Sequence, residues 1–124
     1  SMNSLRILTF TGGICGALGV ALSAVAAHQP ELPNLGTTAN MLLFHAPAFL
    51  ALGLIAGNKV RLVGGWILVA GLAMFAGDLL SRAYLGTRLF PMAAPTGGTL
   101  MIAGWMTVAF SAFAGPKADA NWSR

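Results

Sequence analysis

The chain of 124 residues carries a net charge of +4, yet charged residues make up only 8% of it and hydrophobic residues 56%. Soluble domains contain roughly 25% charged residues, so this composition excludes a soluble globular protein, and the mean hydropathy of +0.76 indicates an integral membrane protein. The basic residues form no patch interleaved with aromatic side chains, which excludes a nucleic-acid-binding surface. The single cysteine, Cys15, excludes an internal disulfide, and we interpret it as a small buried residue.

The first apolar segment, about 5–27, exceeds the roughly 7–15 residues of a signal-peptide core, so we interpret it as a transmembrane helix. Its small residues form two adjacent helical stripes, which are Gly12, Gly16, Gly19, Ser23 and Ala27, and Gly13, Ala17, Ala21 and Ala24. Helices in a bilayer associate by close backbone packing, which small residues permit. The pattern predicts that this helix is the packing axis of the protein and that Gly12, Gly16 and Gly19 contact other helices.

The second segment, about 39–57, follows a loop that contains two prolines and a glycine. Thr37 or Thr38 is predicted to cap its first turn. Pro47 lies inside the segment and lacks a backbone donor, so a kink is predicted near His45.

The third segment, about 62–84, begins after a tight basic turn, and the fourth, about 97–114, follows a connection that contains two prolines. Gly115 and Pro116 are predicted to end the fourth helix. Each of the four segments has close to the ~20 residues that cross a bilayer core. The sequence therefore predicts a single all-α membrane domain over 1–124, a four-helix bundle.

Four spans place both termini on one side of the membrane. Five basic residues fall on that side, which are Arg6, Lys59, Arg61, Lys117 and Arg124. Only Arg88 falls clearly on the other side, with Arg82 close to it. Cytoplasmic loops are enriched in Lys and Arg, so we expect both termini in the cytoplasm.

Polar residues gather at one predicted depth in the outer leaflet. His45 lies roughly six residues inside its segment, about 9 Å from the surface, and Asp78 lies at a similar depth in the third segment. Arg82 stands one turn above Asp78, and His28 ends the first helix on the same side. An intramembrane charge is costly and indicates a functional site. We predict a candidate ligand-binding site at His45, Asp78, Arg82 and His28.

The same residues also have a structural interpretation. Asp78 precedes Arg82 by four residues, the favourable order for an ion pair on a helix, and Arg82 could extend to the headgroups. His45 could be a hydrogen-bonded interior residue, and His28 could cap a helix end. On the third segment, Asp78 and Arg82 share a stripe with Gly64, Leu68, Gly71 and Phe75, so we expect this stripe, with Gly71 as a packing residue, to face the bundle interior.

Other site classes have weaker support. Cu(I) could bind the histidines and Asp78 together with Met41, Met92 or Met101. A haem would need His28 to face His45. An anion could bind where 95–98 opens the fourth helix, although glycine for tight helix entry is an alternative. No motif of fixed ligand spacing is present, and no base is placed beside Ser23 or Ser81. We therefore predict no catalytic residue, no metal and no cofactor.

Several stretches together resemble one family. They are Gly16–Leu22 leading to Ala26–His28, Phe44–Ala46, Phe75–Leu79, Pro95–Gly98 and Gly104–Trp105. In order and spacing they are similar to the small four-span bacterial inner-membrane proteins of unknown function typified by YgdD and YwdK, with relatives in mitochondria. The resemblance covers nearly the whole chain and implies four transmembrane helices in the bacterial inner membrane, but no activity.

The chain departs from the family pattern at two places. Many members have small hydroxyl residues and a tyrosine where this chain has Ala76, Asp78 and Leu80, and a leucine where it has Pro47. Asp78 and Arg82 are therefore expected to mark a subgroup.

Two functional hypotheses follow. The first is a non-enzymatic accessory, assembly or structural protein of the membrane, whose partners are the lipid bilayer and either a second copy or another membrane protein. The second is a binding or transport module for a ligand, a proton or an ion at His45, Asp78 and Arg82.

Overall fold

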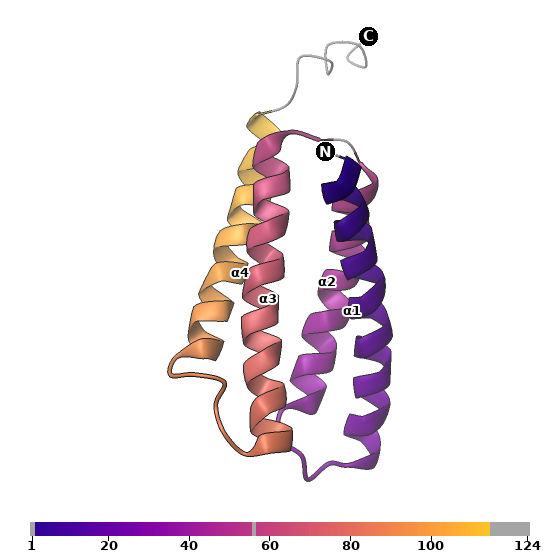
Figure 1. Cartoon of the computed structure of the whole chain (residues 1–124), viewed down its shortest axis with the longest axis vertical. Coiled ribbons are helices and arrows are strands. Elements are labelled where there is room, and N and C mark those ends of the chain that lie inside the picture. Colours follow the sequence, from indigo (N-terminus) through magenta and orange to yellow (C-terminus); the bar gives the residue numbers. More distant parts are fainter. Residues whose placement is uncertain (1, 56, 115–124) are drawn as a thin grey trace.

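The computed structural model describes residues 2–55 and 57–114, and these residues form four α-helices in an up-and-down bundle (Figure 1). The helices are α1 (Met2–His28), α2 (Leu35–Leu54), α3 (Lys59–Leu85) and α4 (Ala93–Phe110), and a short 3₁₀ turn, η1 (Ser111–Phe113), follows α4. No strand occurs within the described ranges, which confirms the all-α prediction. All four helices are long and apolar enough to cross a membrane.

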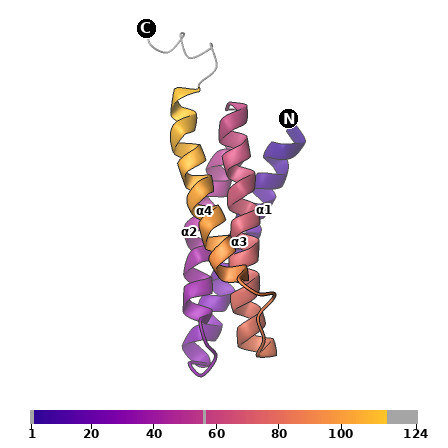
Figure 2. The ribbon, with the colours of Figure 1, turned by 90° about the vertical axis from the view of Figure 1, so that its left-hand side faces the viewer.

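The helices pair as two hairpins. α1 packs along α2, and α3 packs along α4, whereas α2 and α3 form a sparser contact between the hairpins (Figures 1 and 2). The largest core side chains include Leu8, Phe49 and Leu68, which come from three different helices and are all 0% exposed. The bundle therefore has one apolar core, but the closest backbone packing lies within each hairpin.

Glycines explain the close packing of α1 on α2. A Cβ built on Gly12 would lie 2.9 Å from the backbone oxygen of Ala46, and one on Gly19 would lie 2.6 Å from Cγ of Leu43. Gly16 is less constrained, because its Cβ would lie 3.8 Å from that of Ala46, an ordinary contact. These three positions all face α2 and no other helix, so α1 is one half of a hairpin and not the packing axis of the whole bundle.

Glycines also permit close packing of α3 on α4, and here both helices contribute them. A Cβ on Gly71 would lie 2.8 Å from the backbone oxygen of Gly97, and one on Gly97 would lie 2.6 Å from the backbone nitrogen of Phe75. Most of the stripe expected to face inward on α3 is buried, since Gly64, Leu68, Gly71 and Asp78 are all buried. Backbone contact of this kind is how helices associate where no water is expelled.

The four helices all begin earlier than the sequence predicts, α1 and α3 by three residues and α2 and α4 by four. α2 begins at Leu35 after Asn34, which adopts a left-handed conformation (φ 64°), and the Thr38 hydroxyl donates to the Asn34 carbonyl within the first turn. α4 begins at Ala93, so Pro95 lies inside its first turn. Proline is tolerated there because the first backbone N–H groups of a helix have no intrahelical acceptor.

Asn58 fixes the start of α3. Its side-chain oxygen accepts the Arg61 backbone N–H at 2.8 Å, which caps the helix, and its Nδ2 donates to the Ser111 carbonyl at 3.0 Å. The predicted stop at 115–116 lies outside the described residues.

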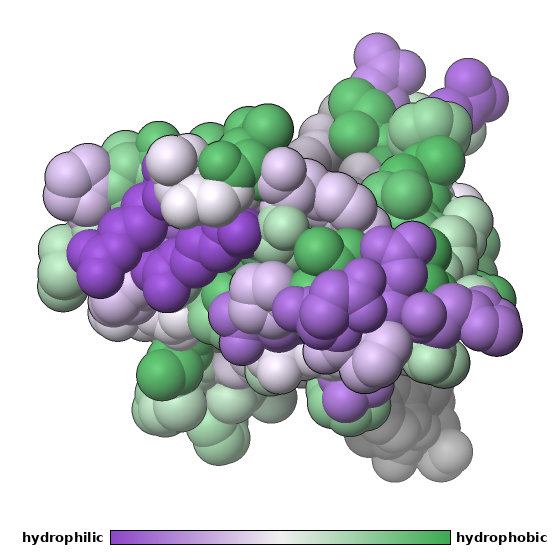
Figure 3. Space-filling view, turned by 90° about the horizontal axis from the view of Figure 1, so that it is seen from below, coloured by the Kyte–Doolittle hydropathy of each residue, from purple (hydrophilic) through white to green (hydrophobic). Residues whose placement is uncertain are grey.

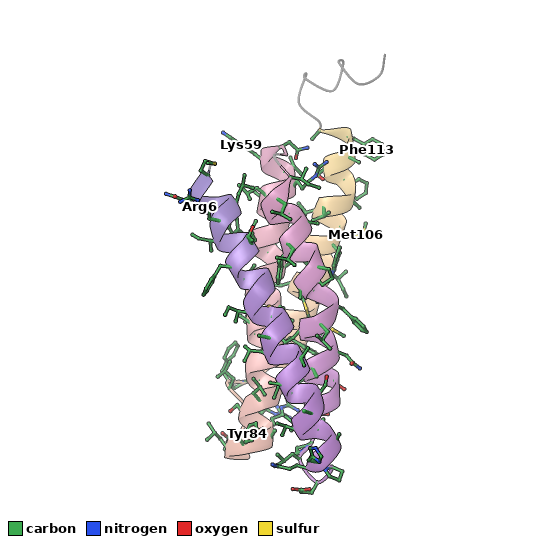
Figure 4. The ribbon with its side chains drawn as sticks, turned by 90° about the vertical axis from the view of Figure 1, so that its right-hand side faces the viewer. Arg6, Lys59, Tyr84, Met106 and Phe113 are labelled. Carbon is green, nitrogen blue, oxygen red and sulfur yellow. The ribbon has the colours of Figure 1, made fainter. Side chains whose placement is uncertain are left out.

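The two ends of the bundle can be told apart by the residues that they hold. The end that holds the connections after α1 and α3 carries a band of hydrophilic residues with hydrophobic residues on either side (Figure 3). Arg6, Lys59 and Phe113 lie at the opposite end from Tyr84 (Figure 4). Which end faces the cytoplasm remains a prediction from the positive-inside rule.

Candidate functional site

Asp78 is the most deeply buried charged residue among those described. Its side chain is 0% exposed, and its Oδ1 accepts the backbone N–H of Leu89 at 2.8 Å. Its Oδ2 lies 2.9 Å from Nη2 of Arg82, an ion-pair contact that lacks the alignment of a hydrogen bond. The predicted i,i+4 pair is therefore present, and Asp78 faces inward as expected, whereas Arg82 is partly exposed.

The carboxylate holds the connection between α3 and α4 in place. Leu89 lies in the middle of this connection, and the Ser81 hydroxyl donates to the Thr87 carbonyl at 2.8 Å from one turn further along α3. Gly86 ends α3 in a left-handed conformation (φ 74°), which turns the chain back toward these groups. Asp78 and Ser81 thus tie the connection to the inner face of α3, and we call Asp78, Ser81, Arg82 and Leu89 the loop-anchor cluster.

Arg82 is the part of this cluster that reaches the surface. Its side chain is 34% exposed, although its Nε is buried and has no hydrogen-bond partner in the described part of the chain. It borders an open hollow of about 600 Å³ on α3 and α4, together with Phe75, Ala94, Pro95, Gly98, Thr99 and Ile102. A ligand in this hollow could meet the guanidinium, but Asp78 lies beneath it.

His45 is buried and has both ring nitrogens engaged. Nδ1 lies 2.8 Å from the Met41 carbonyl, and Nε2 lies 3.1 Å from Nε1 of Trp105. A carbonyl only accepts and an indole N–H only donates, so these partners specify the neutral imidazole with its proton on Nδ1. The ring also packs at 5.6 Å from the Trp105 ring and 6.0 Å from the Phe49 ring.

The structure brings Asp78 and Arg82 together but links neither of them to His45. α2 begins earlier than expected, so His45 lies ten residues from the helix start at Leu35, and Asp78 lies seven residues from the helix end at Leu85. At 1.5 Å per residue the two depths are about 15 Å and 10 Å, roughly one turn apart. His28 lies exposed at the last position of α1. The four predicted residues therefore fall into three places, with Asp78 and Arg82 together and His45 and His28 each apart from them.

The positions of the candidate ligands do not favour the binding of a metal ion or a haem. Within 2–55 and 57–114, no group of three or more His, Cys, Asp and Glu side chains is placed to hold a metal ion. The lone pair of His45 Nε2 already accepts the Trp105 N–H, so it is not available to iron or copper.

Sequence reasoning missed Trp105 and the Leu89 backbone as partners of the polar residues. One signal could have found Trp105, because a tryptophan inside a membrane bundle generally finds a partner for its N–H. Trp105 lies twelve residues from the start of α4 at Ala93, close to the depth of His45. The Leu89 contact had no comparable signal, since it depends on the path of an irregular connection.

Comparison with known proteins places the chain in a family. The DUF423 family, described as a protein of unknown function, matches residues 15–98. A UPF0382 membrane protein of Staphylococcus haemolyticus is 27% identical over 118 residues, which cover 88% of this chain and 97% of that protein. A UPF0382 membrane protein of Haemophilus influenzae is 31% identical over 116 residues, which cover 88% and 92%. No solved structure matches the chain.

These relatives are membrane proteins that match over nearly their whole length, in agreement with the four apolar helices. They confirm the resemblance that the sequence motifs indicated. The chain therefore belongs to the DUF423 family of small membrane proteins, whose function is unknown.

Proposed function

We propose that this protein is a non-enzymatic accessory or assembly protein of the bacterial inner membrane, with both termini in the cytoplasm. In this proposal the four helices form a stable scaffold, and the outer surfaces of α1 and α4 contact a second copy or another membrane protein. The polar residues within the membrane serve the scaffold and do not carry out chemistry.

The observation that carries the proposal is the use of the candidate site residues by the fold itself. The Asp78 carboxylate contacts Arg82 and the Leu89 backbone, and both nitrogens of His45 have partners. A general acid, base or nucleophile needs a group that can reach a substrate. Groups that are buried and already paired are suited to holding elements together.

The exposure of the outer helices supports the second part of the proposal. In an apolar 18-residue window of each helix, α1 and α4 bury 17% and 22% of the residues, against 39% for α2 and 44% for α3. On α1 every residue of the second small-residue stripe is exposed, and a Cβ on Gly13 would meet no atom within 4 Å. A second helix could therefore approach this stripe closely.

Photo-crosslinking in native membranes tests the proposal. A photoreactive residue at Ala17 on α1, or at Ile102 on α4, should trap a second copy or a distinct membrane protein, because both side chains are exposed. Gly13→Ile should abolish the product from Ala17 without changing the stability of the monomer. Gly98→Ile on α4, where an added Cβ also meets no atom within 4 Å, should leave that product intact. A chain that yields only monomer from both positions would contradict the proposal.

One observation favours a second candidate function, the binding of a ligand or ion at the outer-leaflet site. The hollow beside Arg82 exposes part of a guanidinium against an apolar wall. The test is Asp78→Asn compared with Arg82→Gln. If Arg82→Gln removes a binding signal and Asp78→Asn weakens it by releasing the guanidinium, this function gains support. If both variants change the stability of the protein but not the binding signal, the ligand-binding function is refuted.

A further inference from the structure

A cavity of about 230 Å³ lies at the end of the bundle opposite to the loop-anchor cluster. It lies between the hairpins, where the start of α1 and the end of α2 meet the start of α3. Its lining is Leu5, Leu52, Ile55, Gly57, Asn58, Lys59, Arg61 and Leu62. The lining thus joins two cations and a polar amide to a wall of aliphatic side chains. Arg6 and Lys59 mark this end in Figure 4.

The fold holds Arg61 with part of its guanidinium unused. Its backbone N–H is bound by Asn58 Oδ1, and its Nε donates to Ser111 Oγ at 3.3 Å. These bonds fix the side chain while neither Nη atom has a partner within the described ranges. Nη1 lies beside Gly57, a residue of the cavity lining, where a Cβ would be only 3.1 Å from it.

The charge around the cavity is positive and uncompensated by the acids that the structure describes. Glu31 lies in the connection after α1 and Asp78 in the second half of α3, both toward the opposite end of the bundle. The start of α3 adds the partial positive charge of a helix N-terminus to Lys59 and Arg61. The site therefore complements an anion.

We propose that this cavity binds the anionic headgroup of a membrane phospholipid. Lys59 and the Nη atoms of Arg61 would contact the phosphate, and Leu5, Leu52 and Ile55 would contact the start of an acyl chain. Basic pockets between transmembrane helices at the membrane surface bind lipid headgroups in this way. The volume is below the roughly 300–1,000 Å³ of pockets that enclose a whole small molecule, which suits a headgroup whose chains remain in the bilayer. This site is independent of the proposed accessory function.

Native mass spectrometry of the full chain in detergent tests the proposal, with phosphatidylglycerol and phosphatidylcholine of the same acyl chains as probes. Phosphatidylglycerol should bind more tightly. Lys59→Gln should weaken its binding about fivefold, because one basic residue near a membrane surface contributes ~1 kcal/mol of attraction to anionic lipid. Lys59→Gln combined with Arg61→Gln should remove the preference.

Two control variants show whether a change in lipid binding comes from the lost charge or from a disturbed fold. Arg88→Gln removes an exposed cation at the other end and should change nothing. Ser111→Ala removes the partner of Arg61 Nε and keeps both charges, so it should retain most of the preference. Equal affinity for the two lipids, or an equal loss in Ser111→Ala and the double variant, would overturn the proposal. So would full displacement of the lipid by millimolar inorganic phosphate, which would indicate a site for a free anion.

Discussion

The loop-anchor cluster and the His45–Trp105 pair are two polar clusters of this apolar bundle that differ in how far apart their members are in the sequence. The loop-anchor cluster joins residues four and eleven positions apart, Asp78 to Arg82 and Asp78 to Leu89. The other cluster joins His45 to Trp105, which are 60 positions apart. The first is local to one hairpin, and the second connects α2 of one hairpin to α4 of the other.

This difference in sequence separation indicates which part of the fold each cluster stabilises. Asp78 and Ser81 fix the connection within a hairpin that glycine packing already holds together. The His45–Trp105 bond joins α2 to α4, two helices of different hairpins, which pack together less closely than the two helices within a hairpin. We therefore expect loss of the first cluster to be costly because it leaves a charge unpaired, and loss of the second to cost about one hydrogen bond.

The largest effect is expected from Asp78→Ala. This change leaves Arg82 without its counter-charge and the Leu89 N–H without its acceptor. We expect the free energy of unfolding to fall by ~3 kcal/mol, at the lower end of values for broken buried pairs, because Arg82 is partly exposed. Titration with SDS in mixed micelles measures it. Asp78→Asn keeps an acceptor for Leu89 and should cost only ~1 kcal/mol. Equal losses in the two variants would show that charge does not matter here.

The next effect tests whether glycine packing, and not the loop-anchor cluster, holds the second hairpin. Gly97→Ala places a Cβ 2.6 Å from the Phe75 backbone nitrogen, so the helices must separate, at a cost of ~2 kcal/mol. Gly98→Ala is the matched control, since its Cβ meets no atom within 4 Å and alanine favours a helix. Thermal unfolding of both variants in the same detergent compares them. A Gly97→Ala variant as stable as Gly98→Ala would refute the close contact.

A smaller effect is expected where the hairpins meet. Trp105→Phe keeps an aromatic ring but removes the N–H, which leaves His45 Nε2 without a donor. We expect a loss of ~1 kcal/mol, within the range measured for hydrogen bonds between transmembrane helices. Trp66→Phe, on the half-buried face of α3, is the control. A double-mutant cycle of Trp105→Phe with His45→Phe should give a coupling of ~0.6 kcal/mol, and a coupling of zero would exclude the bond.

The smallest effect is expected at Ser81, the second side chain that holds the connection between α3 and α4. Ser81→Ala removes the bond to the Thr87 carbonyl, at a cost of ~0.5–1 kcal/mol, and should mainly increase hydrogen exchange in 86–92. Ser23→Ala removes a hydroxyl that binds the carbonyl of Gly19 within its own helix, so it should leave exchange in 86–92 unchanged. Unchanged exchange in Ser81→Ala would mean that Asp78 alone holds the connection.

The sequence by itself was sufficient to predict the membrane class, the four spans and the Asp78–Arg82 pair. These features depend on hydrophobic length and on helical periodicity, both of which are local properties of the chain. The small-residue stripes were also visible, because close helix packing requires them. Helix starts were less accurate, as at Leu35 and Ala93, because left-handed residues before them permitted earlier helical turns.

Only the tertiary structure decided which partners the polar residues have. The Leu89 contact depends on the path of an irregular connection, and the Trp105 contact depends on how two hairpins rotate against each other. The sequence placed His45 near Asp78 by depth alone, but depth does not give the direction in which a side chain points around its helix. The same rotation decides that Gly12 faces α2 while Gly13 remains open, because adjacent residues on a helix face directions about 100° apart.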